Sequence, residues 1–194
     1  STSGIASGGF QNTYGGGGVL DAFLVKFNSA GVRQWATYYG GTGNDKSNRV
    51  TTDASGNVYL AGQTESTSGI ASGGFQNTYG GGGDAFLVKF SSAGARQWAT
   101  YYGATGNDYG YGVATDASGN VYLEGCTESA TGIASGGFQN THAGGLYDAF
   151  LVKFNSAGAR QWATYYGGTE EDYSYGVTTD VSGNVYLGGW TFSA

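Results

Sequence analysis

The sequence of 194 residues lacks proline and methionine, and it has a single cysteine and a single histidine. Cys126 has no second cysteine to pair with, so an internal disulfide is excluded. A lone histidine, His142, argues against a zinc site and against a histidine-based catalytic triad. Because the chain starts at Ser1 without any methionine, we expect a processed product, an excised piece or part of a longer protein.

Charged residues are also scarce, at 11% of the chain, and they leave a net charge of −6. Binding to a nucleic-acid backbone requires clustered lysine and arginine, which this sequence does not have. We therefore expect no nucleic-acid partner. A run of about 18 apolar residues is also missing, so we expect no membrane span.

Glycine and aromatic residues are abundant instead, with 39 Gly, 16 Tyr and 10 Phe. They recur in register: Trp35, Trp98 and Trp162 are separated by 63 and 64 residues, and every segment between them aligns. Such self-similarity indicates a repeat architecture. We treat residues 1–194 as one domain of three units, approximately residues 1–65, 66–128 and 129–194.

Each unit contains four candidate strands, which in the second unit are residues 84–90, 96–102, 110–115 and 120–124. The last two flank the turn Asp116-Ala-Ser-Gly-Asn120, where Gly119 can take the positive φ that a tight turn needs. Short strands at this spacing predict an all-β fold, and four strands per unit with a repeated aromatic motif favour a β-propeller. The absence of a 3.6-residue apolar period excludes a helical solenoid.

Four motifs then point to a known family: residues 75–90, Trp98-Ala-Thr-Tyr-Tyr-Gly103, Gly106-Asn-Asp108 and Asp116-Ala-Ser-Gly-Asn-Val-Tyr122. The units resemble the bacterial β-propeller repeat family called SBBP, the seven-bladed β-propeller repeat. The resemblance covers nearly the whole chain. It implies a propeller of secreted or cell-surface bacterial proteins, most of which have no assigned activity.

Resemblance to related propellers also implies the strand order within a blade. The innermost strand corresponds to residues 110–115. The strands that correspond to residues 120–124, 84–90 and 96–102 follow it outward in that order. On that order, complete blades cover roughly residues 48–103 and 111–167. The third blade is split: its inner pair, residues 175–179 and 184–188, lies at the C-terminal end. Its outer pair, residues 21–27 and 33–39, lies at the N-terminal end.

A split blade leaves unpaired strand edges, which propellers remove by joining their first and last strands in one blade. Three blades are also fewer than the four to eight that close a ring. We therefore predict a head-to-tail homodimer with six blades. A segment of a longer array and an open filament are the alternatives. The predicted interface residues are Asp21, Phe23, Val25, Phe27, Val185 and Leu187.

Two sets of residues are candidate ligand sites on the face that carries the long loops. Asp45, Asp108 and Asp172 form a predicted carboxylate ring that could bind Ca²⁺ or a sugar hydroxyl. Alternatively, each caps its inner strand by accepting backbone N–H bonds, which we favour because the residue repeats with the scaffold. We expect no cofactor and no dedicated metal site.

The second set lies where the units differ, near the inner strands. Tyr111, Tyr175 and Trp190 could stack on sugars in a channel pocket, or they could adapt the packing between blades. No catalytic set is recognisable. The leading hypothesis is a non-enzymatic, secreted or surface scaffold for binding or adhesion, with carbohydrate as the ligand class considered. A self-assembling structural or engineered repeat module is the alternative, and a propeller glycosidase comes last.

Overall fold

The computed structural model describes residues 4–17 and 20–194, and in this part of the chain it is built of twelve antiparallel β-strands. The first complete blade contains, in spatial order, β3 (Asp45–Thr52), β4 (Val58–Thr64), β5 (Asp84–Phe90) and β6 (Arg96–Tyr102). The second contains β7 (Asp108–Thr115), β8 (Val121–Thr127), β9 (Asp148–Phe154) and β10 (Arg160–Tyr166). Two half-blades remain: β1 (Ala22–Phe27) with β2 (Arg33–Tyr39), and β11 (Asp172–Thr179) with β12 (Val185–Thr191).

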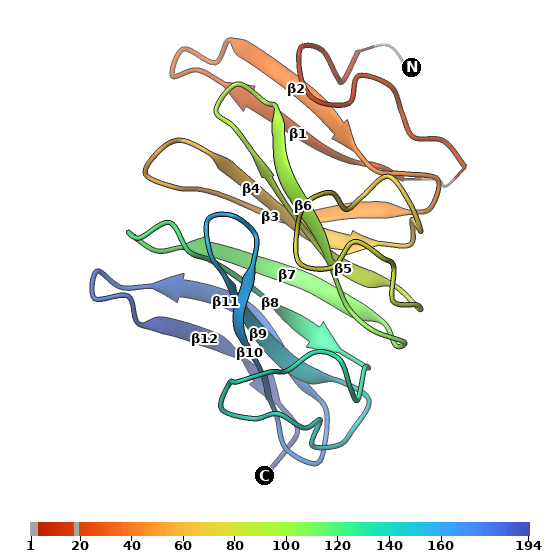
Figure 1. Ribbon diagram of the computed structural model, residues 1–194, viewed down its shortest axis with the longest axis vertical. Coiled ribbons are helices and arrows are strands. Elements are labelled where there is room, and N and C mark those ends of the chain that lie inside the picture. The colour runs from red at the N-terminus through yellow and green to blue at the C-terminus, as the bar shows by residue number, and fades with distance from the viewer. Residues whose placement is uncertain (1–3, 18–19) are drawn as a thin grey trace.

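The sheets follow one another along an arc, with the N-terminal half-blade at one end and the C-terminal half-blade at the other (Figure 1). The innermost strands adjoin, because β7 packs against β3 on one side and against β11 on the other. The short hairpin turns project together to the left in Figure 1, and long glycine-rich loops lie on the opposite side. The predicted all-β propeller class and the split third blade are therefore confirmed.

The strand boundaries differ from the prediction by a few residues. The inner strands begin at Asp45, Asp108 and Asp172, where we expected the blades to start about three residues later, and the second strands extend to Thr64, Thr127 and Thr191. These extra residues mix polar, glycine and aromatic side chains and show no regular apolar alternation. They belong to the strands because the first and second strands of each blade pair there, as Asp45 does with Thr64 and Asp108 with Thr127.

The predicted aspartate turn is confirmed in its geometry. The Asp116 Oδ1 atom accepts the backbone N–H groups of Ser118 and Asn120, both at 2.9 Å, and Gly119 has a φ of 79°. Burial alone would raise the pKa of Asp116, but hydrogen bonds from Asn120, Tyr122 and Ser118 lower it below the usual value. The turn is therefore part of the scaffold.

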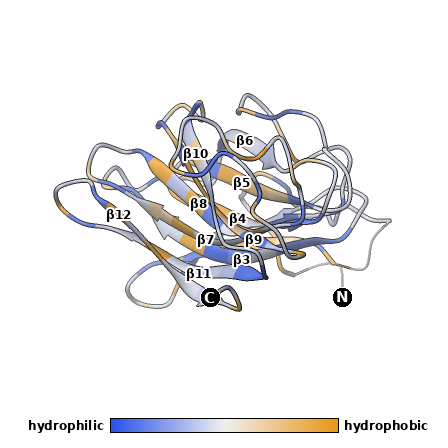
Figure 2. Cartoon of the chain, turned by 90° about the horizontal axis from the view of Figure 1, so that it is seen from below, coloured by the Kyte–Doolittle hydropathy of each residue, from blue (hydrophilic) through white to orange (hydrophobic). Residues whose placement is uncertain are grey.

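The hydrophobic core lies between the blades. One cluster joins the first half-blade to the first complete blade, and the other joins the two complete blades. Trp35 and Trp98 are each 5% exposed and lie in these clusters. In Figure 2 the apolar segments lie mainly along the strands, and the loops are mostly pale or blue.

Candidate functional site: open half-blades and channel aromatics

The two half-blades expose side chains that the complete blades bury. All seven residues of β5 are buried, whereas in β1 Phe23 and Phe27 are 53% and 56% exposed and Val25 is half-buried. In β12, Val185 and Leu187 are half-buried, and the other members of the strand are exposed. Asp21 directly precedes β1 and is half-buried. The predicted interface residues thus line the two open edges, and their pairing across chains stays a prediction.

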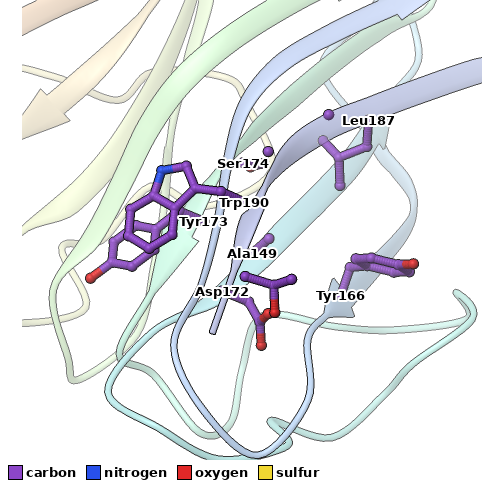
Figure 3. A pocket seen from close by; sticks show the side chains of 10 residues that line it. Ala149, Tyr166, Asp172, Tyr173, Ser174, Leu187 and Trp190 are labelled. Atoms are coloured by element: carbon purple, nitrogen blue, oxygen red, sulfur yellow. The ribbon is translucent and has the colours of Figure 1, made fainter. Parts of the chain in front are cut away.

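A cavity of about 130 Å³ lies beside the C-terminal half-blade, where it faces the second complete blade. Its lining includes Ala149, Tyr166, Leu187 and the main chain around Gly188. Figure 3 shows Tyr166 and Leu187 apart from Tyr173 and Trp190, on the other side of the β11–β12 ribbons. The cavity is mostly apolar and adjoins the unpaired edge of β12.

The three aspartates of the predicted carboxylate ring are buried at the first residue of β3, β7 and β11. In Asp108, Oδ1 accepts the Thr127 hydroxyl, and Oδ2 accepts the Ser129 hydroxyl at 3.0 Å and the Ala104 N–H at 2.7 Å. Asp45 makes the matching bonds to Thr64, Ser66 and Gly41. These are the contacts of a strand cap. Binding of Ca²⁺ or sugar by Asp45, Asp108 and Asp172 stays a prediction.

A second aspartate lies beside each cap. Asp84 is fully buried, its Oδ2 accepts the Gly80 N–H at 2.8 Å, and its Oδ1 has no hydrogen-bond partner among residues 4–17 and 20–194. A Cβ on Gly103 would lie 2.6 Å from both Asp84 Oδ1 and Asp108 Oδ2, so the two carboxyl groups are close. Burial raises the pKa of Asp84 to about 7 and that of Asp108 to about 6. The pairs Asp21 with Asp45 and Asp148 with Asp172 repeat the arrangement.

The aromatic side chains of the second set do come together. The rings of Tyr111 and Tyr175 stack with centroids 5.1 Å apart, and Tyr175 and Trp190 follow at 6.4 Å. Tyr173 stacks on Trp190 at 4.3 Å, and Tyr109 lies parallel to Tyr111 at 6.0 Å. We call these five residues the aromatic arc. Tyr175 and Trp190 are 47% and 44% exposed, so the arc offers aromatic surface to a ligand.

A buried carboxyl group lies near the arc. Glu124 is fully buried on β8, its Oε2 accepts the Ser174 hydroxyl, and its Oε1 has no hydrogen-bond partner in the described structure. Burial raises the pKa of Glu124 to about 7, against smaller lowering effects of Ser174 and of the Arg49 charge. The corresponding positions in the other units are Ala61 and Gly188, so this acid belongs to the second blade alone.

Within residues 4–17 and 20–194, no three His, Cys, Asp or Glu side chains gather so that they could hold a metal ion. Cys126 is buried, and burial raises the pKa of its thiol to about 12. The described residues also form no helix with the length and apolar character that a membrane crossing needs.

Sequence reasoning missed part of the site. Tyr109 and Tyr173 belong to the arc, and they alternate with Tyr111 and Tyr175 along the same strands, which was a readable signal. The partner acids were missed for a different reason. Asp84 precedes an apolar strand in a separate part of the unit, and only folding brings it to Asp108.

The sequence comparisons agree with the architecture. The model of the SBBP β-propeller repeat matches residues 34–69, 97–129 and 161–193. Regulatory protein FlaEY of Caulobacter vibrioides is 28% identical over 107 residues, which are 55% of this chain and 11% of that protein. The uncharacterized WD repeat-containing protein L264 of Acanthamoeba polyphaga mimivirus is 25% identical over 182 residues, covering 80% of this chain and 13% of that protein. The chain thus spans only a small part of either relative.

Proposed function

From the premise that the chain belongs to the SBBP β-propeller repeat family, we propose that it is a non-enzymatic scaffold that assembles head to tail with a second copy. One observation carries the proposal: β1–β2 corresponds to the outer strand pair of a complete blade, and β11–β12 corresponds to the inner pair. Joining them removes both unpaired edges, which otherwise invite aggregation. Two chains then supply six blades, within the range that closes a ring.

The complete blades supply the register of the proposed pairing. In the first blade, β4 and β5 pair Val58 with Phe90, Leu60 with Val88 and Thr64 with Asp84. The same register across chains pairs Val185 with Phe27, Leu187 with Val25 and Thr191 with Asp21. It places Phe23 of the second copy near the cavity beside Tyr166 and Leu187, and so fills it.

The test is the mass of the assembled particle by light scattering over a range of dilution. We expect twice the 19.9 kDa of one chain for the wild type. Phe23→Glu should dissociate the particle, because it places a charge in the apolar cavity without disturbing a buried side chain of the single chain. Val181→Glu is the matched control, since Val181 is 99% exposed and its counterparts Ala54 and Ala117 stay exposed in the complete blades. A stable wild-type particle of one chain would refute the assembly.

A second candidate function, binding of carbohydrate to the scaffold, is favoured by the aromatic arc. Exposed aromatic faces present apolar surface next to polar edges, which suits the C–H faces and hydroxyl groups of sugars. A glycan array with the wild type and Trp190→Ala tests this, and we expect the variant to lose the signal. Gln63→Ala changes the corresponding position of the first unit and should keep it. Equal binding by all three proteins would reject the arc as the site.

The proposal places the scaffold outside the bacterial cell, as the family resemblance implies, and it includes no catalysis. Labelling of intact cells with an antibody tests the location, and labelling only after lysis would contradict it. Incubation of the purified chain with any glycan that binds tests the second point. Release of reducing ends would show a hydrolase instead.

A further inference from the structure

The contacts that join neighbouring blades occur twice inside the chain, and the residues for a third set are divided between its two ends. We propose that Phe138, Lys153, Trp162 and Tyr166, together the acceptor surface, bind the N-terminal segment and the β1–β2 hairpin of a second copy. This inference rests on the proposed head-to-tail assembly. It adds to the backbone pairing of β12 with β1 a set of side-chain contacts, and these contacts determine which partner can bind.

The tyrosine contact is the first member of the set. Tyr39 is fully buried, donates its hydroxyl to the Ile70 carbonyl at 2.6 Å and packs on Phe86 and Phe90, with centroids 5.3 and 5.8 Å away. One blade later, the same arrangement is made by Tyr102, Ile133, Phe150 and Phe154. The contact thus recurs with nearly equal distances at both junctions inside the chain.

The third tyrosine has no such partners among the residues that the structure describes. Tyr166 is 61% exposed, in contrast to 0% and 1% for the other two. The corresponding isoleucine and phenylalanines are at the opposite end: Ile5, Phe23 and Phe27 are 46%, 53% and 56% exposed. We therefore assign the Tyr166 hydroxyl as a donor to the Ile5 carbonyl of the second copy, with the Tyr166 ring on its two phenylalanines.

The tryptophan contact gives a steric marker. The Trp35 Nε1–H donates to the Ser92 carbonyl at 3.1 Å, and a Cβ on Gly94 would lie 2.8 Å from the indole ring. Trp98 has the same relation to Ser156 and Gly158. At the third junction Trp162 is only half-buried, and a Cβ on Gly31 would meet nothing within 4 Å. The indole ring of Trp162 is thus expected against Gly31 of the second copy.

The same division applies to the charged side chains. Lys26 and Lys89 donate to the carbonyls of Ser92 and Ser156, which assigns Lys153 to the Ser29 carbonyl of the second copy. Arg96 lies over the Phe10 ring and Arg160 over the Phe75 ring, both at 4.3 Å.

The remaining arginine and ring have no such partner within the described part of the chain. Phe138 is 86% exposed and Arg33 is exposed. Stacking of Arg33 of the second copy on Phe138 completes the third cation–π pair.

A second copy is the occupant that these observations select, because the missing halves occur in this chain in the required order and register. Tyrosine, tryptophan, lysine and arginine contacts are each made twice, and each lacks its third instance at the same junction. With these contacts, the step from the last blade of one chain to the next chain is the same as the step between blades inside a chain. A closed ring requires such a repeated step.

The decisive variant is Gly31→Asn. Gly31 has a φ of 77°, which asparagine tolerates, and open space surrounds it in the single chain. We expect unchanged unfolding of the dissociated chain and a dimer weakened by about tenfold or more, because the side chain collides with the Trp162 indole. The control is Gly73→Asn, at a φ of 69°, because a Cβ on Gly73 would meet nothing within 4 Å although its junction is complete.

A double-mutant cycle then tests the pairing itself. Arg33→Ala, Phe138→Ala and the double variant are compared by dimer dissociation constant. We expect each single variant to weaken the dimer and the double variant to weaken it by less than the product, because both remove one contact. This inference is overturned if the two single changes in dissociation constant multiply to give the change in the double variant. It is also overturned if the wild type dimerises and Gly31→Asn dimerises equally well. In both cases the proposed assembly itself stands. A wild type that never dimerises would instead overturn the proposed function.

Discussion

The buried acid pair of Asp84 and Asp108 makes the stability of the chain depend on pH in a direction opposite to that of most carboxylates. Asp84 has a pKa of about 7 in the folded chain, because burial raises it from the ordinary value of 3.8. A group whose folded pKa is raised holds its proton more tightly when folded. Its favourable contribution is therefore complete below pH 3.8 and is lost as the pH rises through about 7.

The size of the effect follows from that difference. Each pKa unit corresponds to about 1.4 kcal/mol. Ionisation of Asp84 therefore lowers the free energy of unfolding by at most about 4 kcal/mol when the pH rises from below 3.8 to 8. Asp84→Asn removes this loss. In the variant, the amide oxygen still accepts the Gly80 N–H, and the amide nitrogen takes the position of Asp84 Oδ1 beside Asp108 Oδ2. In the wild type, that Oδ1 atom has no partner among the described residues. We expect the variant to match the wild type at pH 4 and to be more stable at pH 8.

The assay is urea unfolding at one protein concentration, at pH 4, 6 and 8, for the wild type and Asp84→Asn. Asp116→Asn is a control of opposite sign. Its carboxylate accepts hydrogen bonds that lower its pKa, so its contribution is present above 3.8 and is lost as the pH falls through the lowered value. The variant should therefore be less stable at pH 8. If Asp84→Asn shows the wild-type pH slope, the acid pair is not the cause and the reasoning fails.

Three further outcomes follow from the contacts. Tyr102→Phe should lower the free energy of unfolding by about 1 kcal/mol in urea titrations, because it removes the bond to Ile133, whereas Tyr166→Phe should leave the dissociated chain unchanged. Gly119→Ala should cost about 1–2 kcal/mol in the same assay, because the residue has a φ of 79°. Glu124→Gln should raise stability at pH 8 relative to pH 4, because burial raises the pKa of this acid to about 7. Equal effects of the two tyrosine variants would contradict the first expectation. A Gly119→Ala variant as stable as the wild type would contradict the second, and an unchanged pH dependence of stability in Glu124→Gln would contradict the third.

Much of the fold can be read from the residues in order. The recurrence of Trp35, Trp98 and Trp162, together with the turn around Asp116, predicts three four-stranded units, and strand order places the split blade at the two ends. These features are local or strictly periodic. A turn forms from five consecutive residues, and the alternation of apolar side chains lies within a single strand. For that reason the prediction of the all-β propeller class was correct.

Only the tertiary structure decided which distant residues meet. Asp84 and Asp108 recur in every unit as separate motifs, but their carboxyl groups become an acid pair because the blade turns them toward Gly103. Likewise, Tyr39, Tyr102 and Tyr166 are equivalent in sequence, yet two are buried and one is exposed. Their difference arises from whether a following outer pair of strands is present, which is a property of the neighbouring blade in space. Sequence patterns thus determined the blade, and packing between blades determined the acid pairs and the open junction.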